Sequence, residues 1–250
     1  MVITIVFFDE SDWAGAGRKE GDMGVSREQA AENRRAIVAA AEKLFRERGV
    51  DAVGLAELMK AAGFTQGGFY NHFKSKDALV AAVMDKALEE GRETIAGVID
   101  HARQAGADAI EQHIRTYLSA EHRADIEAGC PLSGFAGDAR RLDDEARAAY
   151  AQGLAAYLDG IAAVIEEREG SRAGTQAASE AAVRSEGSRA EAIALLSQLV
   201  GTLVLSRAVV DVAPALADEI LDEGRRHLLD ATGTQVRVAQ ASHARGGTST

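Results

Sequence analysis

Residues 55 to 76 read Leu-Ala-Glu-Leu-Met-Lys-Ala-Ala-Gly-Phe-Thr-Gln-Gly-Gly-Phe-Tyr-Asn-His-Phe-Lys-Ser-Lys, and this stretch decides the fold. It predicts two short helices joined by a glycine turn, with a third helix that begins after Ser75. Two short helices around a tight turn form a helix-turn-helix, which offers one helix to the major groove of DNA. The stretch therefore predicts a DNA-binding unit.

The spacing of apolar residues in this stretch separates core from surface positions. Phe69 and Phe73 are four residues apart, so we expect both to face the core. Thr65 is a favourable N-cap for the second helix, Gln66 could read adenine, and Tyr70 could bond a phosphate. The residues that this leaves for contact with DNA are Thr65, Gln66, Gly67, Gly68, Tyr70, Asn71 and His72.

Two features of the stretch depart from ordinary helix sequences. Gly67 and Gly68 each cost a helix about 1 kcal/mol relative to alanine, which suggests that the backbone approaches DNA closely. The alternative is that they mark a loop. Lys76 places a cation in the first turn of a helix, where the helix dipole disfavours it unless a DNA phosphate binds there. A solvated surface lysine is the alternative.

Composition favours an all-α protein whose charge is unevenly distributed. The chain of 250 residues contains two prolines and 5% aromatic residues, so long helices meet few interruptions. The net charge is -11, yet residues 33–80 carry eight Lys or Arg against five Asp or Glu. A locally basic unit on an acidic body can still bind phosphate.

Periodicity divides the chain into regions. We expect a disordered extension over residues 1–24, with Met23 as a candidate natural start; a short arm that contacts DNA or a partner is the alternative. A helix-turn-helix domain follows over 25–80, with a first helix from about residue 26 to 48 that Gly49 ends. Further helices are expected over about 92–104, 106–120, 131–141, 143–169, 188–211 and 214–230. These helices form a second domain over 81–230, interrupted by a flexible Gly/Ser-rich linker at about 170–187 and followed by a disordered tail over 231–250.

Several classes of protein are disfavoured by what the sequence lacks. A single cysteine, Cys130, allows no internal disulfide and fits a reducing cytoplasm. The longest apolar stretch, Ile193 to Leu205, is too short for a membrane span, so we expect no membrane partner. No nucleotide, protease or hydrolase motif is present, and the six histidines show no metal-ligand spacing. We therefore expect no enzyme, no cofactor and no metal.

These residues carry a family resemblance. Residues 36–79 resemble the DNA-binding domain of the TetR/AcrR family of bacterial regulators. The helix that begins at Leu55 departs from the family pattern because it has no arginine in its first turn. The resemblance implies that Gln66, Gly67, Gly68, Tyr70 and His72 contact DNA and that Lys76 holds a phosphate. The matching residues are Ala40-Ala41, Leu44-Phe45, Gly49, Leu58, Ala61-Ala62-Gly63, Gly67, Phe69-Tyr70, Phe73 and Lys76.

The resemblance also implies that the second domain binds a ligand and forms a homodimer. Two late helices have broad apolar faces, which would pack as a four-helix bundle between two chains; core helices of a monomer are the alternative. The predicted dimer contacts are Leu196, Leu199, Leu203, Leu221 and Leu228. The residues that could line a ligand pocket are His113, Tyr117, Cys130, Phe135, Tyr150 and Tyr157, each of which could equally be core.

The segment around Gly129 and Cys130 resembles a subgroup of the family that has a Gly-Cys motif, and some such relatives sense electrophiles or oxidants. A thiol before a helix start at Pro131 would have a lowered pKa, whereas the nearby Glu127 would raise it. A buried, unreactive cysteine is the alternative. The sequence therefore predicts a cytoplasmic repressor that binds a palindromic DNA operator as a homodimer and is released by a small effector. An activator of the same fold, or a small helical enzyme, is the alternative.

Overall fold

The computed structural model describes the backbone of residues 21–173 and 178–246, and these residues form helices and no strand. The predicted all-α class is confirmed. Most of the predicted N-terminal extension, residues 1–20, lies outside the described residues. The elements are α1 (Gly21–Arg48), α2 (Leu55–Ala61), a 3₁₀ helix η1 (Gln66–Asn71), α3 (Lys76–Gln104), α4 (Ala109–Tyr117), α5 (Ala120–Ala124), α6 (Pro131–Ala139), α7 (Asp144–Ala173), α8 (Ala178–Val209) and α9 (Pro214–Gly246).

The N-terminal unit is organised around the apolar face of α1. Ile37, Ala41 and Phe45 recur at helical spacing and are fully buried. They pack with buried residues of α2, η1 and the start of α3 in one cluster. Gly49 ends α1 with a φ of +83°, a left-handed conformation that favours glycine, as the sequence predicted.

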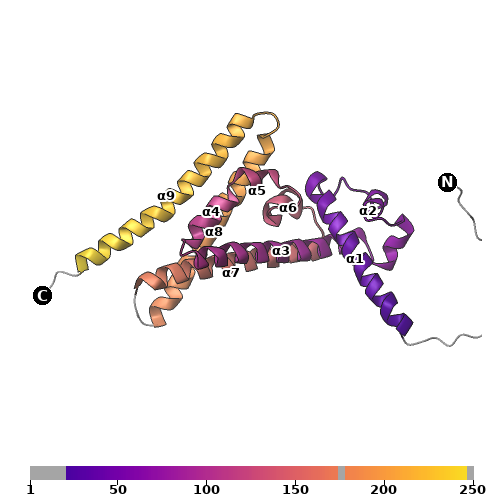
Figure 1. The fold of residues 1–250 in the computed structure, drawn as a ribbon, viewed down its shortest axis with the longest axis horizontal. Coiled ribbons are helices and arrows are strands. Elements are labelled where there is room, and N and C mark those ends of the chain that lie inside the picture. The colour runs from indigo at the N-terminus through magenta and orange to yellow at the C-terminus, as the bar shows by residue number, and fades with distance from the viewer. Residues whose placement is uncertain (1–20, 174–177, 247–250) are drawn as a thin grey trace, which may run out of the picture.

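Helix α3 connects the N-terminal unit to the body without a break (Figure 1). The sequence predicted a separate helix from about residue 92, and this prediction is wrong. The helix continues through Gly91 because packing holds α3 on both sides of this residue: α3 packs on α1 near its N-terminal end and lies along α7 (Figure 1). One rigid element therefore belongs to both domains.

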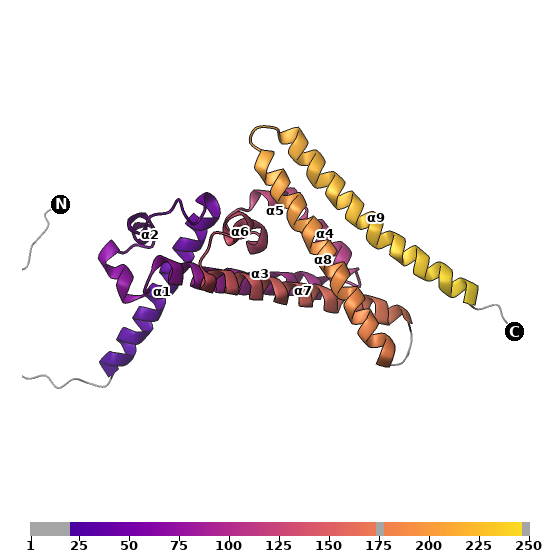
Figure 2. The ribbon, with the colours of Figure 1, turned by 180° about the vertical axis from the view of Figure 1, so that it is seen from behind.

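The body is built from long helices that pack side by side. Helix α7 lies along α3, α8 packs on α7, and α9 folds back along α8, as Figures 1 and 2 both show. The predicted helix over 106–120 is instead two short helices, because each half has its own N-cap. Asp108 accepts hydrogen bonds from the Ile110 and Glu111 amides, and Ser119 accepts one from the His122 amide.

The helices at the C-terminal end are longer than the sequence predicted. The backbone is helical to Ala173 and again from Ala178, so most of the predicted linker at 170–187 is helical, and residues 174–177 lie outside the described residues. Helix α9 runs to Gly246 instead of ending near residue 230. Residues 178–186 contain mainly Ala, Glu, Arg and Ser, and the helix-forming residues among them outweigh the glycine and serine content that suggested a linker.

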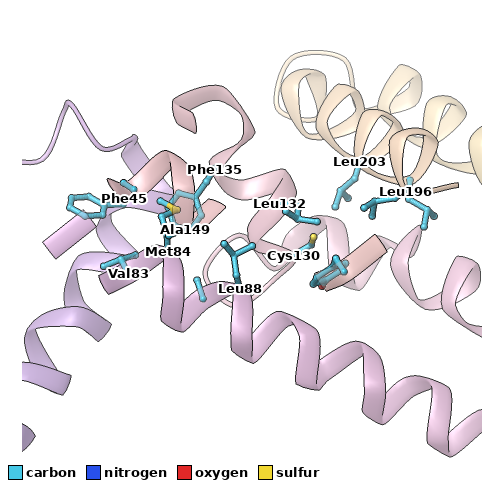
Figure 3. Packing of buried hydrophobic residues seen from close by; sticks show 14 of the residues in the cluster. Phe45, Val83, Met84, Leu88, Cys130, Leu132, Phe135, Ala149, Leu196 and Leu203 are labelled. Atoms are coloured by element: carbon cyan, nitrogen blue, oxygen red, sulfur yellow. The ribbon is translucent and has the colours of Figure 1, made fainter. Parts of the chain in front are cut away.

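A continuous row of buried side chains links the two domains (Figure 3). It runs from Phe45 in α1 through Leu88 in α3 and Leu132 in α6 to Leu203 in α8, and Cys130 lies within it. Because interiors are close-packed, a change at one point in such a row is transmitted to its neighbours.

Two helices are long and apolar enough to cross a membrane, by length and composition alone. They are the segments Asp144–Arg168 of α7 and Glu186–Val209 of α8, whereas the sequence reading found no stretch of sufficient length. Core helices of proteins that do not enter membranes pass the same test. Each of the two packs on neighbouring helices, α7 on α3 and α8 on α9.

The contact between α3 and α7 provides a test of packing. A methyl group at Gly153 of α7 would lie 2.7 Å from Leu88 Cβ, whereas one at Gly160 of the same helix would meet no atom within 4 Å. We expect Gly153→Ala to lower the free energy of unfolding by about 1–3 kcal/mol through overpacking. Gly160→Ala should raise it by about 0.5–1 kcal/mol through helix propensity. Urea denaturation measures both, and equal shifts would contradict the close α3–α7 approach.

Candidate nucleic-acid interface and effector cavity

The segment expected to contact DNA is a six-residue 3₁₀ helix of about two turns. It follows Thr65, whose backbone is extended as an N-cap requires, although its hydroxyl makes no capping hydrogen bond. The predicted recognition helix is therefore shorter and tighter than an α-helix. Two consecutive glycines explain this because they weaken α-helical propensity at its first positions.

Two phenylalanines hold η1 against the rest of the unit. Phe69 is fully buried, Phe73 is 4% exposed, and their rings stack with centroids 5.8 Å apart. This confirms that both face the core. Tyr70, between them, is 69% exposed. The exposed residues of this turn, which we call the reading surface, are Thr65, Gln66, Gly67, Tyr70 and Asn71.

The two other residues predicted to contact DNA lie further inward. Gly68 is half-buried, and a Cβ there would lie 3.8 Å from the Met59 methyl group. His72 is also half-buried, and its ring lies 6.5 Å from that of Phe64. Both residues therefore pack beneath the reading surface and contribute less exposed area to it than its other members do.

Lys76 has partners within the protein. Its ammonium group donates hydrogen bonds to the carbonyl oxygens of Val50 at 2.6 Å and Val53 at 2.7 Å. These bonds use two of the three donors of the ammonium group, so the contact between Lys76 and a DNA phosphate stays a prediction. Within the protein, Lys76 closes the loop between α1 and α2 over the start of α3.

A cavity of about 290 Å³ lies in the body between α3, α4, α7 and the loop before α6. Among the predicted ligand-binding residues, His113, Tyr117, Cys130 and Tyr157 line it. Phe135 and Tyr150 do not, which corrects that part of the prediction. The Phe135 ring lies beneath the Arg46 guanidinium at 5.2 Å, and the Tyr150 hydroxyl donates to the Leu132 carbonyl at 3.0 Å.

Two polar atoms on the α4 side of the cavity have no hydrogen-bond partner. His113 Nε2 and the Tyr117 hydroxyl are both buried and unpaired. Burial, with a smaller contribution from His122, lowers the pKa of His113 to about 4, so its ring is neutral at pH 7. Burial and the nearby Cys130 raise the pKa of Tyr117. An unpaired buried polar group costs about 1–3 kcal/mol of stability. Two such groups side by side are unusual in a hydrophobic core that binds no ligand.

His122 fixes the loop that forms one wall of the cavity. Its Nδ1 lies 2.7 Å from the Tyr117 carbonyl oxygen, and its Nε2 accepts a hydrogen bond from the Cys130 amide at 3.0 Å. Only the neutral ring with its proton on Nδ1 can make both bonds. Burial is the main cause that lowers the pKa of His122, which favours this neutral form.

The same loop is held from both sides by arginines. Arg46 of α1 donates to the Gly129 carbonyl oxygen at 2.7 Å, and Arg207 of α8 donates to the His122 and Asp125 carbonyl oxygens at 2.6 and 2.9 Å. A Cβ at Gly129 would lie 2.3 Å from the Asp125 carbonyl oxygen, so only glycine fits there. The segment from His122 at the end of α5 to Cys130, which we call the loop 122–130, therefore bridges the N-terminal unit and α8.

A buried ion pair holds Arg46 in place. Glu42 accepts hydrogen bonds from Arg46 Nε and Nη2 at 3.0 and 2.7 Å and pairs with Lys86 of α3 at 2.9 Å. The Arg46 and Glu42 side chains are 3% and 9% exposed. Removing one member of such a pair leaves an uncompensated buried charge. The loop therefore has a fixed partner in the N-terminal unit.

Comparison with known proteins identifies the N-terminal unit. The profile described as "Bacterial regulatory proteins, tetR family" matches residues 37–83, which span the C-terminal part of α1, all of α2 and η1, and the first turns of α3. Residues 37–83 therefore form a DNA-binding domain of the TetR family.

Two curated relatives agree with this assignment over part of their length. The HTH-type transcriptional regulator TtgR of Pseudomonas putida is 42% identical over 64 residues, which are 26% of this chain and 30% of TtgR. The HTH-type transcriptional repressor NemR of Escherichia coli is 24% identical over 122 residues, which are 49% of this chain and 61% of NemR. The chain thus spans less than two thirds of either relative.

Solved structures extend the likeness of the fold to the body. The reduced form of Escherichia coli NemR superposes with a TM-score of 0.63 at 18% identity, over 80% of this chain and 97% of that one. A TetR transcriptional regulator from Chloroflexus aurantiacus gives 0.60 at 23% identity, over 80% and 94%. At these identities the likeness concerns the fold.

The leucines predicted at a dimer interface lie inside the core of the single chain. Leu196, Leu199, Leu203, Leu221 and Leu228 are at most 4% exposed within one chain and pack with the common core. This corrects the prediction for these five residues, because the apolar faces that they form are covered by neighbouring helices. The exposed apolar residues on α8, α9 and their connection are Ile193, Val204, Leu205, Val212 and Leu216.

Sequence reasoning missed two cations beside the reading surface. Lys74 follows η1 directly, is exposed, and has no ion-pair partner within the described part of the chain. Arg34 of α1 places its guanidinium 4.4 Å from the centre of the Phe73 ring. The excess of basic residues over 33–80 was the signal that could have identified them.

The two lysines that flank Ser75 should therefore behave differently when replaced. Lys76→Met leaves two carbonyls unpaired and should lower the free energy of unfolding by about 1–3 kcal/mol. Lys74→Met should leave stability unchanged, weaken DNA binding, and reduce the slope of binding against salt by about one. Thermal denaturation and DNA titration at several salt concentrations separate the two effects. A stable Lys76→Met protein would contradict the structural assignment.

Proposed function

We propose that the protein is a cytoplasmic transcriptional regulator that binds a palindromic operator as a homodimer and represses until a small effector releases it. The observation that carries the proposal is the reading surface. A short turn held by two buried phenylalanines presents Gln66, Tyr70 and Asn71 outward, beside the unpaired Lys74. Tyrosine, amide and lysine side chains on a rigid turn suit contacts with phosphates and base edges.

DNA binding is tested by titration with the DNA that flanks the protein's own gene, at several salt concentrations. A Cβ at Gly67 would meet no atom within 4 Å, so Gly67→Ala should leave the free protein folded. If the backbone approaches DNA at this point, the added methyl group should weaken binding at least about tenfold by steric exclusion. The loss should occur without a fall in the unfolding temperature.

Gly97→Ala is the matched control, because Gly97 is exposed on α3 and a Cβ there also meets nothing within 4 Å. It should bind DNA as the wild type does. Equal affinities of the Gly67 and Gly97 variants would remove Gly67 from the reading surface. Absence of salt-sensitive binding to any of the flanking DNA would contradict the proposed function.

A two-fold operator requires a two-fold protein, and α8 and α9 supply a suitable surface. Leu205 is 59% exposed and Leu216 is 46% exposed, so each leaves apolar area that a second copy would cover. Dimerisation through this face would set the separation of the two reading surfaces, which must match half-sites about one helical turn apart.

A charge at the proposed dimer face should separate the two chains. Leu205→Glu should shift sedimentation toward the monomer and abolish operator binding, because a charge would be buried without a partner. Ile126→Glu, at another exposed apolar residue that is 46% exposed, is the control and should stay dimeric. Dimers in both variants would argue against the α8–α9 face.

Effector control is supported by the position of the cavity. Its wall includes Gly129 and Cys130, and the Gly129 carbonyl binds Arg46 of α1. A ligand that displaces this loop would favour a different orientation of the N-terminal unit, with a spacing that no longer matches the operator. A reporter gene distinguishes repression from activation. Lower expression with the protein and recovery with effector indicate a repressor, and the opposite signs indicate an activator.

Covalent release at Cys130 is a second form of this control. Cys130 lines the cavity, so an electrophile that enters the cavity would meet its thiol. We expect N-ethylmaleimide to weaken DNA binding by the wild type at least about tenfold and to leave Cys130→Ser unaffected. Insensitivity of both proteins would leave a non-covalent effector as the only form of release.

A further inference from the structure

The cavity is small. Its volume of about 290 Å³ is near the lower end of the roughly 300–1,000 Å³ that is typical of ligand pockets. An engineered cavity of about 150 Å³ holds benzene, so this one has room for a molecule of one or two rings. Ile95, Val98 and Pro131 contribute apolar walls. The cavity therefore suits a compact and mainly apolar molecule.

Two unpaired atoms give this apolar cavity a polar side. His113 and Tyr117 are each 4% exposed, lie four residues apart on α4, and both line the cavity. Neither His113 Nε2 nor the Tyr117 hydroxyl has a hydrogen-bond partner among the residues that the structure describes. The hydroxyl of Ser133, near Tyr117, is already engaged with the Cys130 carbonyl and with Arg207. The unpaired atoms can therefore be satisfied by a ligand.

The contrast with Tyr157 on the opposite wall strengthens this reading. The Tyr157 hydroxyl donates to the Gly91 carbonyl oxygen at 3.0 Å, so it is satisfied without a ligand. Two tyrosines thus line one cavity, one paired and one unpaired. Only the unpaired one gains a hydrogen bond when an oxygen atom enters.

The charges around the cavity select a neutral molecule. Its lining contains Glu121 and Asp125 and no lysine or arginine. Its two histidines, His113 and His122, are kept in the neutral form by burial. Arg207 lies outside this lining, and its guanidinium already donates to Ser133 and to the His122 and Asp125 carbonyl oxygens, so an anionic ligand would meet carboxylates without a free cation in the lining.

We infer that this cavity binds a neutral molecule of one or two rings through one hydroxyl or carbonyl oxygen, which is hydrogen-bonded by Tyr117 and His113. A hydroxyl can accept from Tyr117 and donate to His113 Nε2, and a carbonyl can accept from both. The inference names the effector class of the proposed regulator and so rests on the proposed function. The binding itself is measurable without DNA.

Four probes that share the toluene framework test the inference by calorimetry on the free full-length protein. para-Cresol and para-methylacetophenone carry the oxygen, toluene lacks it, and para-toluate is an anion. The wild type should bind para-cresol about three- to tenfold more tightly than toluene, because a neutral hydrogen bond contributes that much. It should bind para-methylacetophenone more tightly than toluene as well, and para-toluate most weakly. Toluene binding as tightly as para-cresol, or no binding by any probe, would overturn the inference.

Two conservative variants separate a ligand-binding role from a structural one. Tyr117→Phe removes a hydroxyl that has no partner, so the unfolding temperature without ligand should stay equal or rise, while the preference for para-cresol over toluene is lost. Tyr157→Phe removes a paired hydroxyl, so the unfolding temperature should fall while the preference stays. A Tyr117→Phe protein that keeps the preference would contradict the inference.

The DNA assay distinguishes this inference from the proposed function. Oxygen-dependent binding that leaves operator binding unchanged would support the ligand class and refute effector control through this cavity. Release from the operator by toluene and para-cresol at equal concentrations would support effector control and refute the oxygen-binding role of Tyr117 and His113.

Discussion

One buried guanidinium joins the two halves of this protein. Arg46 lies in α1, is held by Glu42 of the same helix, and binds the Gly129 carbonyl of a loop in the body. The Arg46 and Glu42 side chains are both buried. Removing one partner of such a buried ion pair costs about 3–5 kcal/mol of folding stability. Because such a contact tolerates little displacement, the N-terminal unit and the loop must move together or separate completely.

The loop that Arg46 holds is also a wall of the cavity and a contact of α8. His122 binds the Cys130 amide, and Arg207 binds the His122 and Asp125 carbonyls. The cavity, α8 and α1 of the N-terminal unit therefore meet at residues 122–130. Because several hydrogen bonds meet at this loop, ligand binding in the cavity can change the orientation of the N-terminal unit relative to the body. Coupling free energies between two such sites are typically about 1–3 kcal/mol.

The sequence predicted those features that depend on local spacing. Phe69 and Phe73, four residues apart, had to face the same side, and so Tyr70 had to face outward. His113 and Tyr117 lie on one face of α4 for the same reason. The all-α class followed from few prolines and long amphipathic stretches.

Features that depend on distant partners could not be predicted in this way. Lys76 binds carbonyls from the α1–α2 loop, and Arg46 binds a residue 83 positions away. The leucines of α8 and α9 have broad apolar faces, but periodicity does not say whether the same chain or a second copy covers them. In the structure the same chain covers them, and a different set of apolar residues stays exposed.

Because α3 runs unbroken from one domain into the other, an insertion in this helix would change how the two domains are placed. Helix α3 begins in the N-terminal unit and ends deep in the body. One residue inserted into its middle would rotate one domain against the other by about 100° and translate it by about 1.5 Å. The Arg46 contact would then be lost, since it needs a fixed azimuth as well as a fixed distance. Insertions and deletions are therefore compatible with this architecture only in the loops. The length of α3 fixes both the angle and the distance between the two domains.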